Sequence, residues 1–225
     1  MRLGLAAAAA LVALALVAPA AADIDAATGG GALQIVVPKD GDDYSALVAR
    51  AVAHDKSIDF RALRFAYLKS AARKNSKADL DALKNILFDT AKSGDDQKVR
   101  DAAVKLLSEN YTDLWGHKFL RQACAKLHDD QCAEQGHFVE FGLLNSIMSS
   151  GDGKTCDTGW EVAAVAEEYF IIGMMGDTPS QQSLIGGKNG SCDLLHVKDD
   201  NGKFQDYYFR IDAVLADEMA MFGGH

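Results

Sequence analysis

The sequence predicts a mainly α fold of stacked antiparallel helical hairpins, tetratricopeptide-like, with a small C-terminal β-hairpin and a short terminal helix. Three observations lead to this class. A block of the chain repeats itself with an offset of 34 residues, only three prolines occur, and an Asn-Gly pair lies between two β-rich runs near the C-terminus. A period of about 34 is typical of helical hairpins that bury apolar faces against their neighbours, and scarce proline suits long helices.

The repeat is visible residue by residue. Asp79-Leu80 corresponds to Asp113-Leu114, and Asp95-Asp96-Gln97 corresponds to Asp129-Asp130-Gln131. Lys84 corresponds to Lys118. Such arrays usually hold partners, so the repeat informs architecture more than activity.

The N-terminal segment has the pattern of a signal peptide. Arg2 precedes an apolar, alanine-rich stretch, and Pro19 to Ala22 supply small residues for cleavage. We assign residues 1–22 to the signal peptide and 23–42 to a flexible linker, of which Leu33–Val37 is expected to dock on the folded body.

Residues 43–175 are assigned to the helical repeat domain. Apolar spacing and capping residues predict helices over 44–53, 59–74, 112–127, 131–148 and 159–175, and a pair of helices separated by Gly94. In the helix over 131–148 we expect four side chains to face inward: Phe141, Leu144, Ile147 and Met148.

Residues 176–225 are assigned to a C-terminal β-hairpin lobe packed on the helices. The β-rich runs 194–197 and 204–211 flank Asn201-Gly202, a pair that favours a type I′ turn. In that register Asp193 faces Arg210 and His196 faces Tyr207. Two strands alone are marginal in water, so they must pack on helices or pair with another strand.

Four cysteines in an exported chain predict disulfides, and the sequence permits three connectivities. Proximity favours Cys124–Cys132 and Cys156–Cys192. The alternative for Cys124, His128, Cys132 and His137 is a zinc site. The spacing does not form tight ligand pairs, and His128 corresponds to Gly94, a turn position, so we predict no metal.

Two further segments carry candidate site residues. Gly151, Asp152, Gly153 and Lys154 predict a loop that resembles a phosphate-binding loop only at its end, because a strand and an earlier glycine are missing. In Glu167-Glu168-Tyr169 adjacent carboxylates point about 100° apart, so they do not form a catalytic pair. We expect one exposed glutamate and one that is paired or caps a neighbour.

These segments also carry a resemblance. The order of residues 149–155, Glu167-Glu168-Tyr169, 192–195 and 208–212 resembles the bacterial exported family named domain of unknown function 4919, from about Tyr44 onward. The resemblance implies a helical repeat protein with a β-rich end, and no reaction, ligand or catalytic residue. It suggests that the loop 150–155, with Glu168 and Tyr169, is a binding or structural element. The four cysteines depart from the family pattern.

The functional prediction is an exported, non-enzymatic module of the bacterial envelope, periplasmic or secreted, that binds a protein or an extended peptide. The formal charge of −9 disfavours nucleic acid as a partner. No catalytic motif, cofactor-binding motif or second membrane-length apolar run is present in the sequence. The alternative is an envelope hydrolase or a metal-dependent enzyme, with acids and histidines assembled in space.

Overall fold

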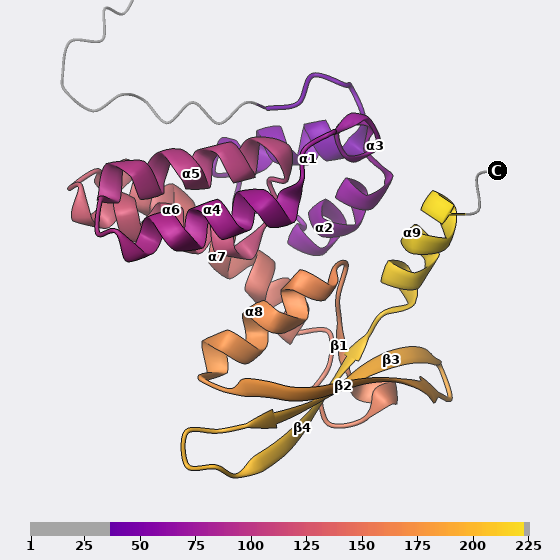
Figure 1. The fold of residues 1–225 in the computed structure, drawn as a ribbon. Coiled ribbons are helices and arrows are strands. Elements are labelled where there is room, and N and C mark those ends of the chain that lie inside the picture. The colour runs from indigo at the N-terminus through magenta and orange to yellow at the C-terminus, as the bar shows by residue number, and fades with distance from the viewer. Residues whose placement is uncertain (1–36, 223–225) are drawn as a thin grey trace, which may run out of the picture. The chain divides into compact units, whose positions relative to one another are not determined.

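The computed structural model describes residues 37–222, so the predicted signal peptide and most of the predicted linker lie outside the described residues. The helices of the first part are α1 (Asp43–Val52), α2 (Phe60–Lys69), α3 (Ala71–Asn75), α4 (Leu80–Lys92), α5 (Asp96–Glu109), α6 (Leu114–Lys126) and α7 (Asp130–Met148). There follow the 3-10 turn η1 (Cys156–Thr158), β1 (Trp160–Glu161), α8 (Val165–Met175), β2 (Thr178–Gly187), β3 (Gly190–Lys198), β4 (Phe204–Arg210) and α9 (Asp212–Phe222). The described chain is therefore mainly helical and has a small C-terminal sheet (Figure 1).

Helices α4 to α7 pack against one another in chain order (Figure 1). The 34-residue repeat appears here as repeated capping. Asp79 and Asp113 accept hydrogen bonds from the backbone N–H of Ala82 and Gly116 at 2.9 Å each. Asp95 caps α5 in the same way. Because each carboxylate satisfies an N–H that has no partner inside the helix, these aspartates fix where the helices begin.

The turns that end α4 and α6 are equivalent too. Gly94 has φ 74° and His128 has φ 57°, so both adopt the left-handed conformation that ends helices. The prediction that His128 occupies a turn position is confirmed.

Two apolar clusters form the interior. One lies within α4–α7 and includes Leu87, Leu106 and Leu120. The other joins α1, α2, α7, α8 and the sheet, with Val48, Leu143, Phe170, Leu195 and Phe209 among its members. The C-terminal sheet thus shares its core with the first helices and α7.

Three helix predictions were wrong in detail. The helix expected over 59–74 breaks at Ser70, which has extended backbone angles and caps α3 through its hydroxyl. Phe141 is 44% exposed instead of buried, because the inner stripe of α7 runs through Val139, Leu143 and Ile147. Leu144 and Met148 are partly buried against the same core.

The helix predicted over 159–175 begins only at Val165. Trp160 and Glu161 form β1, which pairs in parallel with Phe209 and Arg210 of β4. The close approach of Gly159 to the Tyr208 carbonyl brings this segment against the sheet, and a Cβ on Gly159 would lie 2.7 Å from that oxygen.

Between residues 37 and 222 the sheet has four strands in the order β1-β4-β3-β2, so the predicted hairpin, β3–β4, is its interior. Strand β2 was not predicted. Its sequence is rich in Gln, Ser and Gly, which are poor in strand propensity, and as an edge strand it is largely exposed. It supplies the additional pairing that a lone hairpin needs.

The predicted hairpin register was wrong by one residue. His196 pairs with Asp206, and Asp193 pairs with Phe209. Among residues 199–203 only Gly202 has a positive φ, so the turn is not the type I′ turn that Asn201-Gly202 suggested. Instead Asp199 accepts hydrogen bonds from the N–H groups of Asn201 and Lys203 and closes a longer loop.

Candidate functional site

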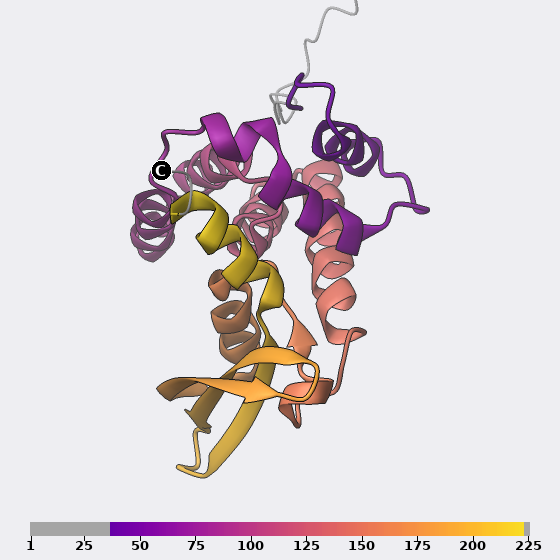
Figure 2. The ribbon, with the colours of Figure 1, turned by 90° about the vertical axis from the view of Figure 1, so that its right-hand side faces the viewer.

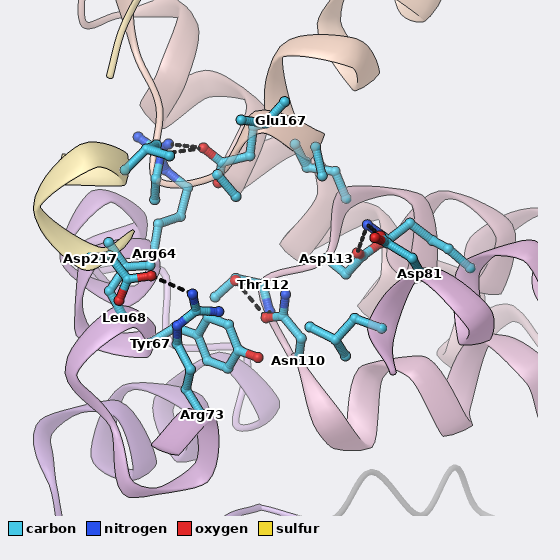
Figure 3. A pocket seen from close by; sticks show the side chains of 18 of the residues that line it. Arg64, Tyr67, Leu68, Arg73, Asp81, Asn110, Thr112, Asp113, Glu167 and Asp217 are labelled. Carbon is cyan, nitrogen blue, oxygen red and sulfur yellow. Dashed lines mark hydrogen bonds and ion pairs between the residues drawn. The ribbon is translucent and has the colours of Figure 1, made fainter. Parts of the chain in front are cut away.

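A cavity of about 470 Å³, lined by charged and apolar residues, lies where the starts of α4, α6 and α8 meet α2, α3 and α9 (Figure 3). Figure 2 shows α9 continuing from the end of β4 toward the first helices, where it supplies part of the wall. This volume is within the usual range of small-molecule pockets. The charged residues of its lining are Arg64, Arg73, Asp79, Asp81, Lys84, Asp113, Glu167, Asp217 and Glu218.

Arg64 and Glu167 form a buried ion pair at one side of the cavity. The Arg64 guanidinium lies 2.7 Å from Glu167 Oε2, and the side chains are 0% and 8% exposed. Arg64 also donates to Ser146 Oγ and to the Glu161 carbonyl. Burial raises the pKa of Glu167, and the Arg64 charge opposes that rise. Removal of either partner would leave a buried charge uncompensated, so this pair holds α2 against the start of α8.

Arg73 and Asp217 form a second pair, between α3 and α9. The Arg73 guanidinium also lies 5.6 Å from the centre of the Tyr67 ring, within the range of a cation–π contact. The pair therefore ties the C-terminal helix to the cavity wall.

Lys84 lies at the opposite side and is held loosely. Its Nζ is 3.6 Å from Asp81 Oδ1 and 3.7 Å from Asp113 Oδ2, both beyond ordinary hydrogen-bond distance. Asp113 uses Oδ1 to cap α6, and burial raises its pKa. The ammonium group of Lys84 can thus move without breaking a short hydrogen bond.

The start of α8 also faces the cavity. Its N-cap is Ala164, which has no side chain able to cap, and Glu167 reaches back to the N–H of Ala163 instead. Val165 and Ala166 belong to the lining. Polar backbone and charged side chains therefore share this wall with small apolar groups, an arrangement suited to binding.

The loop residues predicted as a candidate site pack on the sheet. The N–H groups of Asp152 and Gly153 donate to the Thr158 carbonyl, and the Gly153 carbonyl accepts from Tyr208 N–H. A Cβ on Gly153 would lie 2.6 Å from the Trp160 ring, so glycine is needed there. Lys154 is exposed. These contacts hold Asp152 and Gly153 against the sheet, and Gly151 to Lys154 lie outside the lining of the cavity.

Glu168 and Tyr169 lie elsewhere, where α8 packs over β2 and β3. Tyr169 donates to Gln182 Oε1 at 2.8 Å, and Gln182 Nε2 donates to Asp193 at 2.6 Å. Glu168 is fully buried, and neither of its carboxyl oxygens has a hydrogen-bond partner among the described residues. Burial, with Asp193 nearby, raises the pKa of Glu168 to about 9. The expectation of one exposed glutamate is wrong, because both Glu167 and Glu168 are buried.

Disulfides join Cys124 to Cys132 and Cys156 to Cys192, the pairing that the sequence favoured. Asp129 lies near the first pair, but sulfurs joined in a disulfide are not thiolate ligands. His137 contacts the Phe141 ring, and His128 lies in the turn.

Sequence reasoning did not identify the cavity, because its walls come from segments up to about 150 residues apart. One signal was present. Asp79 and Asp113 are equivalent in the repeat, and Lys84 corresponds to Lys118, so the array repeats charged residues at the starts of its helices.

A family model described as a domain of unknown function (DUF4919) matches residues 39–220. The chain belongs to the DUF4919 family. The match includes every residue that lines the cavity, so the cavity lies within the part of the chain that the family defines. No curated protein and no solved structure matched the chain.

Proposed function

We propose that this DUF4919 protein is an exported, non-enzymatic module that binds a protein or an extended peptide, with the cavity between the helix starts as its binding site. The observation that carries the proposal is that each cation lining the cavity faces a carboxylate: Arg64 faces Glu167, Arg73 faces Asp217 and Lys84 faces Asp113. A few placed polar groups among apolar ones can orient a bound group by hydrogen bonds, which supports recognition of a partner.

The proposed architecture is tetratricopeptide-like. Support comes from the packing of α4 to α7 in chain order and from N-caps repeated at an offset of 34 residues. Arrays of this kind present extended surfaces for partners.

Export is supported by the signal-peptide pattern of residues 1–22 and by the two disulfides, which persist in oxidising compartments such as the periplasm. Between residues 37 and 222, no helix combines the length and apolarity that a membrane span requires.

The alternative function is that of a hydrolase. It is favoured by Asp113 and Glu167, two buried carboxyl groups with raised pKa at one cavity. Histidine, which the acid/histidine version of this hypothesis requires, does not occur among the described residues that line the cavity.

A screen of random peptides against the oxidised protein tests the proposal. We expect enriched peptides whose binding is abolished by Ala166→Phe, which places an aromatic ring at the cavity wall. Ala125→Phe, at an exposed position of α6, is the matched control and should leave binding unchanged. Peptides that bind the two variants equally would contradict the proposal.

The same peptides separate binding from hydrolysis. Each is incubated with the protein and then analysed by mass spectrometry. Intact peptides agree with a binding module, whereas cleavage that Asp113→Asn abolishes would establish the hydrolase.

A further inference from the structure

The charge of the cavity indicates what kind of group it takes. Among the described residues, six acidic and three basic residues line it, so after each cation is matched with one carboxylate an excess of three negative charges remains. Two of these acids, Asp79 and Asp81, lie at the start of α4, and Asp81 Oδ1 is 3.6 Å from the Lys84 ammonium group.

The two acids nearest to Lys84 differ in their exposure to solvent. The Asp81 side chain is 91% exposed, whereas that of Asp113 is 5% exposed. Between them lies the Lys84 ammonium group, at 3.6 and 3.7 Å from the two carboxylates. A cation is thus already held between these carboxylates, but too loosely to complete hydrogen bonds with them.

The Oδ2 atom of Asp113 is the carboxylate oxygen that is placed to accept a hydrogen bond from a ligand. The Oδ1 atom accepts the Gly116 N–H, while Oδ2 has Lys84 as its cation at 3.7 Å. A guanidinium group carries five donors in a rigid planar fork and is more weakly hydrated than an ammonium group, so it pairs with a buried carboxylate better than lysine does.

We propose that the cavity takes a basic side chain of the partner, preferably arginine, whose guanidinium binds Asp113 Oδ2 and displaces the Lys84 ammonium group toward solvent. The inference rests on the proposed function and specifies its ligand class as a basic peptide residue. Lys84 acts as an internal competitor that occupies the place of the ligand's cation in the empty cavity.

Calorimetric titration with single blocked amino acids tests this. The probes are N-acetyl-arginine methylamide, its neutral analogue N-acetyl-citrulline methylamide, and N-acetyl-glutamate methylamide. We expect the arginine probe to bind about tenfold or more tightly than the citrulline probe, because a charge-assisted hydrogen bond is lost with the charge. The glutamate probe should not bind.

Two variants locate the contact. Asp113→Asn should weaken arginine binding about tenfold while keeping α6 capped, since asparagine caps helices as well as aspartate does. Lys84→Gln should strengthen binding several-fold, because the competing cation is gone. Asp95→Asn, at the N-cap of α5, is the control that changes charge and cap equally but lies outside the cavity lining. Thermal unfolding of each variant verifies that it is folded.

The outcomes separate this inference from the proposed function. Citrulline or glutamate probes that bind as tightly as arginine, with binding lost in Ala166→Phe, would overturn the ligand class and leave the binding site in place. Arginine binding that is equal in the parent and in Asp113→Asn would overturn the contact. If none of the three probes binds, the inference fails, and the random-peptide screen decides the proposed function independently.

Discussion

The array α4–α7 and the lobe built from α8 and the sheet treat their polar groups differently. In the array, the aspartate at each helix start accepts a hydrogen bond from a backbone N–H three residues further along the chain. Ion pairs such as Lys92–Asp89 are exposed to solvent. In the lobe, Glu167 depends on Arg64, which is 103 residues away, and Glu168 has no hydrogen-bond partner among the described residues. The local caps are repeated in the sequence, whereas the Arg64–Glu167 pair joins distant segments and lies in the wall of the cavity.

Among the substitutions compared at one pH, the largest expected difference concerns ion pairs. Arg64→Met should destabilise the protein by about 3–5 kcal/mol, because Glu167 is left buried without its counter-charge. Lys92→Met removes an exposed pair of the array, and it should change the free energy of unfolding by less than about 1 kcal/mol. Urea unfolding measures both.

The double variant Arg64→Met/Glu167→Gln sharpens this test. It removes the uncompensated charge, so it should be more stable than Arg64→Met alone. If the double variant is as unstable as the single one, the loss comes from packing and the buried pair is not the cause.

The two disulfides offer the second comparison. Cys156–Cys192 spans 36 residues and ties η1 to the sheet, whereas Cys124–Cys132 spans 8 residues within the array. Loop-closure entropy predicts a loss of about 4 kcal/mol for the first pair and about 2.5 kcal/mol for the second when each is replaced by alanines. The measurement is urea unfolding of the two double-alanine variants. Equal losses would show that strain or residual structure outweighs chain entropy.

Glu168 makes the stability of the lobe depend on pH. Its pKa is about 9 in the folded state and ordinarily 4.5, so between these values the folded protein holds a proton that the unfolded chain has released. Stability should therefore fall as pH rises from about 4.5 to 9, by at most about 1.4 kcal/mol per pH unit from this group.

Glu168→Gln should remove that dependence, and thermal unfolding from pH 5 to 9 measures it. The matched variant in the array is Glu109→Gln, on α5, for which we expect the slope of the parent to persist. A slope that survives in Glu168→Gln would assign the pH dependence to other groups.

The same division explains what the sequence could predict. The cap at Asp95 and the turn at His128 follow from short-range patterns, the disulfide pairing follows from proximity in the sequence, and the structure agrees with each. Strand β2 was missed because its pairing with β3, and not strand propensity, makes it a strand. The hairpin register was missed because the loop closed by Asp199 sets it. The cavity was missed for a related reason, since Arg64 and Glu167 look like ordinary surface charges until the fold brings them together.

The smallest effect concerns how α8 begins. Each helix of the array starts at an aspartate whose side chain accepts a backbone hydrogen bond, but α8 starts at Ala164 without one. Ala164 already has the extended backbone angles of an N-cap, so Ala164→Ser should stabilise the protein by about 0.5–1 kcal/mol. Asp79→Ala should cost about 1 kcal/mol at the start of α4. Thermal unfolding of both variants measures whether the stability gained from a new cap on α8 is similar to the stability lost with the cap of α4. If Ala164→Ser gives no gain, the N–H groups at the start of α8 are already satisfied by solvent, and the lobe lacks a capping residue without energetic consequence.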